Sequence, residues 1–340
     1  MTREQSTMMK GVAILLMLFL HLFNHAENVA LTSPLLFVGD TALVSIMARA
    51  TNPVAFFLFL GGYGLYKVWQ KGDKHRISRI VKLYLHYWAI ITAFLIIGHF
   101  INPEKYPGGI IDIINNYTSF NTTYNAEMWF LLPYVVVSLL SPWLFRLCER
   151  VNPWLVVLGT LFIHLCTSFC ISRYGAVFLY TNMWIYNPLL VFHMLFNFML
   201  GATVARCRVY EKLKDRVTPP PYCLNHLSIS VLAVVLAVLL FTVACYFKYF
   251  YGYAFFFMTA LLYCPIPKWG RMVLCSLGKH SMNMWMIHSW FCYYLFKSFI
   301  YGFKYPIVIF VVLVVVSFLS SVAIEMMLKP VERKIFTKNN

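Results

Sequence analysis

One histidine lies deep inside the first apolar segment of the chain. The segment from Lys10 to His21 has a cation at one end and an imidazole at the other, with ten uncharged residues between them. At about 1.5 Å per helical residue the two are roughly 16 Å apart, so a Lys10 at the membrane surface puts His21 deep in the bilayer. An ionisable group at that depth is costly, and its presence indicates a functional site.

The composition identifies the class of protein to which this histidine belongs. Of the 340 residues, 61% are hydrophobic and only 12% are charged, whereas a soluble chain carries about 25% charge. We therefore expect a polytopic membrane protein in which residues 1–340 form one transmembrane domain, with no separate soluble domain. The net charge of +16 does not indicate nucleic-acid binding, because the basic residues gather in alternate loops, as membrane topology produces.

Ten apolar runs approach the length that a membrane-crossing helix needs, about 17–25 residues. With the N-terminus in the cytoplasm, 22 of the 28 lysines and arginines fall in cytoplasmic segments. This asymmetry predicts an all-α bundle of about ten transmembrane helices with both termini cytoplasmic. The predicted spans are 8–28, 42–66, 80–100, 127–147, 153–171, 185–205, 227–247, 249–266, 280–300 and 305–328.

Polar side chains at membrane depth are few, and many of them are histidines. His21 and His25 are four residues apart and face the same way on a helix. A lone buried histidine more often bridges two helices than performs chemistry, but several in one bundle favour at least one functional role. The nine cysteines show no metal-ligand spacing, so no metal is expected. The other polar residues at depth are Asn24, His86, His99, Glu127, His164, His193, Asn197, Ser281, Asn283, His288 and Glu325.

Two arginines form a second candidate site at the cytoplasmic mouth of the third span. Arg76 and Arg79 are three residues apart, which presents two planar cations on one helix face. This geometry suits phosphate oxygens. Positive charge on the cytoplasmic side, or binding of anionic lipid headgroups, explains the pair equally well.

Five motifs follow one another in the order found in a known family. From about residue 8 to 334 the chain resembles the acyltransferase 3 family, integral membrane O-acyltransferases that acetylate surface glycans. Three positions depart from the usual pattern: Gly61 stands where serine is common, Lys82 stands where proline is common, and Glu127 stands where a histidine often precedes the Trp-Phe-Leu motif. The motifs are Lys10 with His21, Phe57 to Tyr63, Arg76 with Arg79, Trp129 to Leu131, and Gly278 to His288.

The resemblance implies an acyl-CoA donor on the cytoplasmic side, acetyl-CoA above all, with no permanently bound cofactor. Lys10, Arg76 and Arg79 would bind the phosphates of the donor. His21 would be the catalytic residue, either as a general base or as a transient carrier of the acyl group. Four further residues are secondary candidates for the site: Glu127, Trp129, Ser281 and His288.

The expected acceptor is a sugar hydroxyl on a lipid-linked or surface glycan at the outer face of a bacterial plasma membrane. The expected partners are membrane lipids and a second copy or a glycan-synthesis enzyme, and no nucleic acid. Two other functions fit the same residues. A transporter or flippase would use the buried histidines for protons or substrate, and a membrane component without its own chemistry would present substrate to a partner enzyme.

Overall fold

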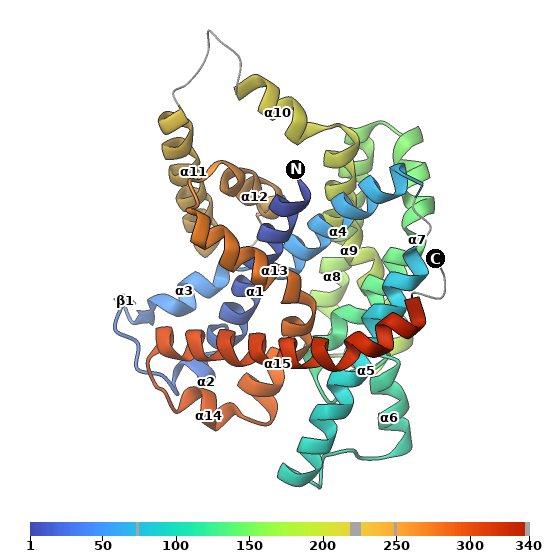
Figure 1. Ribbon diagram of the computed structural model, residues 1–340, viewed down its shortest axis with the longest axis vertical. Helices are drawn as coiled ribbons and strands as arrows, with labels where there is room; N and C mark the ends of the chain where they lie inside the picture. Colours follow the sequence, from blue (N-terminus) through green and yellow to red (C-terminus); the bar gives the residue numbers. More distant parts are fainter. Residues whose placement is uncertain (73–74, 218–225, 248–249, 337–340) are drawn as a thin grey trace.

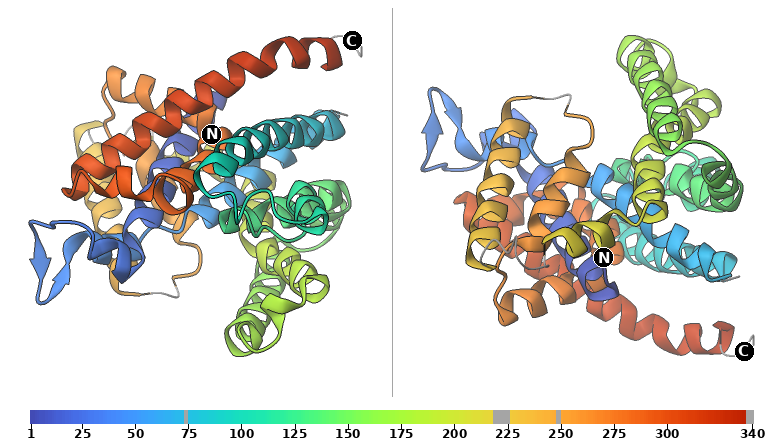
Figure 2. Two further views of the ribbon diagram at one scale, coloured as in Figure 1. Left: turned by 90° about the horizontal axis from the view of Figure 1, so that it is seen from below. Right: turned by 90° about the horizontal axis from the view of Figure 1, so that it is seen from above.

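The computed structural model describes residues 1–72, 75–217, 226–247 and 250–336, and Figure 1 shows that they form a bundle of helices. Helices make up 81% of the structure, which confirms the predicted all-α class. The strands in the described residues are β1 (Phe37–Val38) and β2 (Thr41–Ala42), a short antiparallel hairpin that projects from the bundle beside α3 (Figure 2).

Fifteen α-helices follow one another within the described residues, and three short helices of other kinds interrupt them. The short ones are the 3-10 helices η1 (Ala126–Phe130) and η2 (Leu179–Thr181) and the π-helix η3 (Trp290–Tyr294). The α-helices are α1 (Arg3–Phe23), α2 (Ala26–Val29), α3 (Leu43–Arg49), α4 (Pro53–Gln70), α5 (Arg76–Ile101), α6 (Ile110–Tyr117), α7 (Leu131–Arg150), α8 (Pro153–Tyr174), α9 (Met183–Arg206), α10 (Val209–Val217), α11 (His226–Tyr246), α12 (Tyr253–Tyr263), α13 (Lys268–Ser289), α14 (Lys297–Tyr301) and α15 (Pro306–Phe336).

Eight of the ten predicted spans correspond to helical segments that are long and apolar enough to cross a membrane. The span predicted at 249–266 contains only the 11 residues of α12. The span predicted at 280–300 is displaced, because α13 begins in the basic segment at Lys268 and ends at Ser289. The protein is an integral membrane protein, while the count of ten spans and the cytoplasmic location of both termini remain predictions.

The second predicted span contains a break that local chemistry explains. Helix α3 ends at Arg49 and α4 begins at Pro53. The side chain of Asn52 accepts a hydrogen bond from the backbone N–H of Ala55 and caps α4. Proline is favoured in the first turn, where its missing N–H leaves no helical hydrogen bond unmade. The chain therefore restarts its helix at this point.

Helices α1 and α13 pack against each other in parallel at the centre of the bundle (Figure 1). Their backbones cross at two glycines. A Cβ atom on Gly11 would lie 2.0 Å from the carbonyl oxygen of Leu274, and one on Gly278 would lie 1.9 Å from that of Thr7. Neither distance is sterically possible, so this contact requires glycine on both helices. Small residues at such crossings are typical of helix packing in membranes.

Helix α15 crosses α13 and runs beside α5, as the view from below shows (Figure 2). His86 joins all three helices: its Nδ1 lies 2.8 Å from Oδ1 of Asn283 on α13, and its Nε2 lies 2.6 Å from Oε1 of Glu332 on α15. Lys82 pairs with the same carboxylate at 2.8 Å. His86 thus bridges helices, the structural role expected of a lone buried histidine.

The glycine crossing predicts that glycine-to-alanine substitutions change the stability of the protein differently at different positions. Gly11→Ala and Gly278→Ala should each destabilise the protein by about 1–3 kcal/mol, because each added methyl group meets backbone that cannot move aside alone. Gly159→Ala on α8 is the control, since its Cβ would meet nothing within 4 Å, and it should stabilise its helix by roughly 0.5–1 kcal/mol. Thermal unfolding in detergent measures all three. A Gly278→Ala protein as stable as Gly159→Ala would contradict the close crossing.

Candidate active site

The central crossing brings two of the predicted residues into contact. His21 and His288 each lie ten residues beyond the crossing glycine of their own helix. Because α1 and α13 run in parallel, equal steps of about 15 Å along both helices bring the two imidazoles to the same level. Their ring centroids are 4.9 Å apart, with 47° between the ring planes. We call them the histidine pair.

The hydrogen bonds of His288 determine which of its nitrogens is basic. Its Nδ1 lies 2.7 Å from the carbonyl oxygen of Trp285 and 3.3 Å from that of Met284. Carbonyl oxygens only accept, so Nδ1 carries the proton and Nε2 carries the lone pair. Nε2 is buried, and no hydrogen-bond partner for it exists among the described residues. This buried nitrogen therefore has an unused lone pair.

A tyrosine determines which nitrogen of His21 is basic. The hydroxyl of Tyr293 lies 2.5 Å from the backbone carbonyl oxygen of His21, 3.2 Å from Oδ1 of Asn24 and 3.3 Å from Nδ1 of His21. The single hydroxyl proton goes to one of the two oxygens, so Nδ1 of His21 must donate to the tyrosine. Nε2 of His21 is then the basic nitrogen, and the tyrosine holds the ring in place.

A short π-helix puts that tyrosine within reach. In η3 the N–H of Leu295 donates to the carbonyl of Trp290, five residues earlier, at 2.9 Å. Such π-turns inside α-helices are frequent at functional sites. The wider turn sends Tyr293 to His21 and Tyr294 to Glu127. Neither tyrosine could be recognised from the sequence, because no local pattern distinguishes a π-turn from the apolar helix expected at 280–300.

A second polar group of residues lies next to the histidine pair. The hydroxyl of Tyr294 donates to Oε2 of Glu127 at 2.8 Å. With its amide oriented to satisfy both neighbours, Asn125 donates to the same carboxylate at 3.0 Å and accepts from Nε1 of Trp290 at 3.0 Å. His25 is close enough to interact electrostatically with Glu127. This carboxylate stands where the family often has histidine, and it is firmly held.

A cavity of about 190 Å³ leads from Lys10 towards the histidine pair, and we call it the inner cavity. It ends at Met17, four residues before His21, and at Trp285, three residues before His288. The histidine pair therefore lies about one helical turn beyond its end. The residues that line it are Lys10, Met17, Val54, Phe57, Gly61, Leu83, Phe130, Tyr134, Ser281, Met282 and Trp285.

The two predicted arginines differ in their surroundings. Arg79 is exposed one turn before Leu83, which lines the inner cavity, and it interacts electrostatically with Tyr134, another lining residue. The guanidinium of Arg76 lies 6.0 Å from the ring of Trp143. Its buried Nε has no hydrogen-bond partner in the described part of the chain. Arg79 is thus the nearer of the two to the inner cavity.

Helix η1 sends three of its side chains to different places. Glu127 meets Tyr294, and Phe130 packs edge-on against Trp285 with 5.4 Å between ring centroids. Trp129 instead lines a separate cavity between α4, α8 and α9. A 3-10 helix has about three residues per turn, so residues 127 and 130 share a face and residue 129 does not. Trp129 therefore does not join the histidine pair directly.

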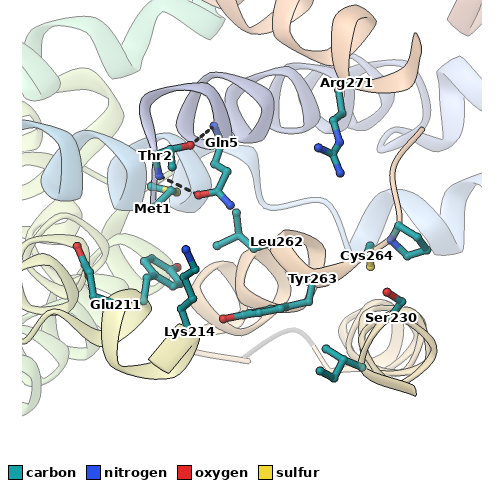
Figure 3. A pocket seen from close by; sticks show the side chains of 13 residues that line it. Met1, Thr2, Gln5, Glu211, Lys214, Ser230, Leu262, Tyr263, Cys264 and Arg271 are labelled. Atoms are coloured by element: carbon teal, nitrogen blue, oxygen red, sulfur yellow. Dashed lines mark hydrogen bonds between the residues drawn. The ribbon is translucent and has the colours of Figure 1, made fainter. Parts of the chain in front are cut away.

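A larger cavity, of about 540 Å³, lies near the N-terminus between α1, α10, α11 and α12 (Figure 3). Lys214 and Arg271 extend towards it from different helices (Figure 3). Burial alone would raise the pKa of Glu211, but its hydrogen bonds and its 3.2 Å contact with Lys67 hold that pKa below its ordinary value. None of the predicted site residues lines this cavity. We assign the chemistry to the inner cavity, which is smaller but ends about one helical turn from the histidine pair.

Comparison with known proteins identifies the family of the chain as a whole. Residues 5–326 match the family model described as an acyltransferase domain. No curated protein and no solved structure matches the chain significantly. The match spans both helices of the histidine pair, η1 and the arginines of α5.

The position of Tyr293 predicts a specific effect on catalysis. Tyr293→Phe removes the hydroxyl that holds Nδ1 of His21, and we expect catalytic turnover to fall about 10-fold, the equivalent of one hydrogen bond of about 1.5 kcal/mol. Tyr301→Phe is the matched control, because its hydroxyl donates to the backbone of Leu22 at 3.0 Å and does not touch the imidazole. Turnover is measured at equal amounts of folded protein. Equal turnover in the two variants would remove Tyr293 from the site.

Proposed function

Because this chain belongs to the acyltransferase 3 family, we propose that it transfers an acetyl group from cytoplasmic acetyl-CoA to a hydroxyl of a lipid-linked or surface glycan. The family establishes a membrane acyltransferase; the acetyl donor, the glycan acceptor and the catalytic base are our proposal. The observation that carries it is the histidine pair, which lies one turn beyond the inner cavity with a basic nitrogen on each ring.

The donor enters from the end of the inner cavity where Lys10 lies. Lys10 and Arg79 supply positive charge there for the phosphates of coenzyme A. The rest of the cavity is mainly apolar, with Met17, Phe57 and Trp285 among its walls. The thioester arm of the donor extends along these walls and brings its acyl carbon to the histidine pair. Holding the reacting carbonyl next to the base makes the step effectively unimolecular.

His21 acts as the general base. Its Nε2 takes the proton of the acceptor hydroxyl while the hydroxyl oxygen attacks the acyl carbon. The bond from that carbon to sulfur then breaks, and coenzyme A leaves as a thiol after it takes up the proton from His21. A two-step route, in which His21 carries the acyl group before the acceptor arrives, uses the same nitrogen. The hydroxyl of Tyr293 keeps that nitrogen directed to the substrate in either route.

His288 and Glu127 support this chemistry from two sides. His288 is fully buried beside His21, and its proton is fixed on Nδ1 by the carbonyl of Trp285. Its Nε2 accepts a hydrogen bond from a second hydroxyl of the acceptor, because the attacking hydroxyl gives its one proton to His21. Glu127, held by Tyr294, interacts electrostatically with His25, one helical turn after His21, and supplies negative charge on that side of the protonated imidazole that forms during the reaction.

The central test replaces His21. Loss of a general base costs about 10²–10⁴ in rate, so His21→Ala should abolish measurable transfer of labelled acetyl groups from acetyl-CoA to extracted membrane glycolipids. His21→Asn should not restore transfer, because an amide does not take up the proton. We expect His288→Ala to impair transfer less. All variants are compared at equal membrane abundance.

The outcomes of this assay separate the candidate functions. Full transfer by a well-inserted His21→Ala protein would exclude His21 as the base and favour His288 or a partner enzyme. If the purified wild-type protein neither hydrolyses acetyl-CoA nor transfers its acetyl group, the transporter or flippase becomes the better hypothesis. Bulk activity that is independent of His21 in membranes but absent from purified protein would indicate a substrate-presenting component.

The donor site gives a second prediction. Arg79→Ala should weaken acetyl-CoA binding by about 1.5–3 kcal/mol, the range for a hydrogen bond to a charged group, and Arg76→Ala should do so by less. Lysine at position 79 should restore affinity only in part, because it lacks the planar fork. Arg146→Ala is the control, since Arg146 lies 6.0 Å from the same Trp143 ring as Arg76. Isothermal titration with acetyl-CoA measures the affinities. Equal affinities in all variants would mean that the arginines do not bind the donor and reflect membrane topology alone.

A further inference from the structure

A cavity of about 310 Å³ with both polar and apolar walls lies between α4, α8, α9 and the turn before α12, and we call it the outer cavity. It is separate from the inner cavity and does not include the histidine pair. Its volume is at the lower end of small-ligand pockets, about 300–1,000 Å³. Its lining residues include Asn52, Trp129, His164, Ser168, His193 and Asn197.

Two stacked imidazoles form one wall of the outer cavity. The rings of His164 and His193 have centroids 4.1 Å apart and planes 27° apart. Nδ1 of His164 lies 2.7 Å from the backbone carbonyl oxygen of His193, so it donates its proton there. Nε2 of His164 is then a hydrogen-bond acceptor. This contact also joins α8 to α9, which satisfies the structural role expected of His164.

The proton on His193 is located by its two hydroxyl neighbours. Nδ1 of His193 lies 3.2 Å from Oγ1 of Thr167 and 3.4 Å from Oγ of Ser168. Both hydroxyls lie within hydrogen-bond distance of backbone carbonyl oxygens of α8, at 2.9 Å for Thr167 and 2.7 Å for Ser168. A hydroxyl has one proton, so each must accept from His193, whose Nδ1 is therefore the donor. Nε2 of His193 becomes a second acceptor.

The ligand that suits this wall offers hydroxyl protons. Within the described residues no three histidine, cysteine, aspartate or glutamate side chains are close enough to hold a metal ion, so the two imidazoles do not form a metal centre. Asn52 and Asn197 add amide groups that both donate and accept. Four aromatic rings, from Trp129, Phe250, Tyr251 and Tyr253, supply flat apolar surface. Hydroxyl groups together with an apolar C–H face are the chemistry of a sugar ring.

From this arrangement we infer that the outer cavity binds a sugar ring of the acceptor glycan, a different ring from the one that is acetylated. This inference rests on the proposed function. Helix η1 links the two places, because Trp129 lines the outer cavity while Glu127 lies beside Tyr294 near the histidine pair. Val54 lines both the outer and the inner cavity. The two cavities are therefore neighbours that share the side chain of Val54.

The test removes one acceptor and keeps the contact that holds the helices together. In His164→Asn the amide nitrogen takes the place of Nδ1 and still donates to the carbonyl of His193, but the cavity loses Nε2. His193→Asn makes the same change on the other ring and serves if the first variant does not fold. His99→Asn is the matched control: Nδ1 of His99 also lies near a backbone carbonyl, that of Tyr106 at 3.2 Å, and His99 lines none of the three cavities.

Two measurements follow. The first is the KM for extracted membrane glycolipids in labelled acetyl transfer, with acetyl-CoA affinity measured alongside. The second is saturation-transfer NMR of oligosaccharides released from the same extract, which needs no acetyl donor. His164→Asn should raise the acceptor KM about 3- to 10-fold, the equivalent of one neutral hydrogen bond. It should also weaken the oligosaccharide signal, while acetyl-CoA affinity and the His99→Asn protein stay unchanged.

Other outcomes separate this inference from the proposed function. Unchanged acceptor KM in both outer-cavity variants, with transfer intact, overturns the sugar site and leaves the acyltransferase standing. A wild-type protein that gives no oligosaccharide signal also overturns it. A wild-type protein that transfers no acetyl group, yet gives an oligosaccharide signal that His164→Asn weakens, supports sugar binding in the outer cavity and removes the proposed reaction.

Discussion

The structure depends on one contact, the crossing of α1 and α13 at Gly11 and Gly278. At these positions each helix lies against a carbonyl oxygen of the other, so close that a Cβ atom has no room. The contact fixes the relative height of two parallel helices, and each carries its histidine ten residues further on. The 4.9 Å separation of His21 and His288 follows from that height. A shift of one helical turn, about 5.4 Å, would separate the rings.

Around this pair, two departures from α-helical geometry direct the remaining side chains. The π-helix η3 turns Tyr293 and Tyr294 back towards α1 and η1. The 3-10 helix η1 sends Glu127 and Trp129 to different sides. Regular helices would place side chains only at α-helical intervals, whereas these two short segments bring groups from distant parts of the chain to a common centre. Helix η1 contributes Phe130 to the inner cavity and Trp129 to the outer cavity, and η3 contributes Tyr293 to the histidine pair.

The sequence predicted the outline of this arrangement well and two of its elements poorly. The all-α class, the family and eight of the spans agree with the structure. At 249–266 and 280–300 the helices have other bounds than the predicted spans. Hydropathy records where apolar residues are dense, but α13 begins in a basic segment at Lys268, where packing against α1 stabilises it. Helix α12 is shorter than its apolar run, because Gly252 and Pro265 bound it.

By itself the sequence determined what depends on composition and local spacing. These include the membrane class, the depth of His21 on its helix, the shared face of Arg76 and Arg79, and the motifs of the family. Only the tertiary structure decided which buried histidines meet, because the pairs His21 with His288 and His164 with His193 depend on how distant helices pack. It also decided which ring nitrogens stay basic, since that depends on carbonyl and hydroxyl groups that folding brings to each imidazole. Periodicity along one helix carries no information about the register between two helices.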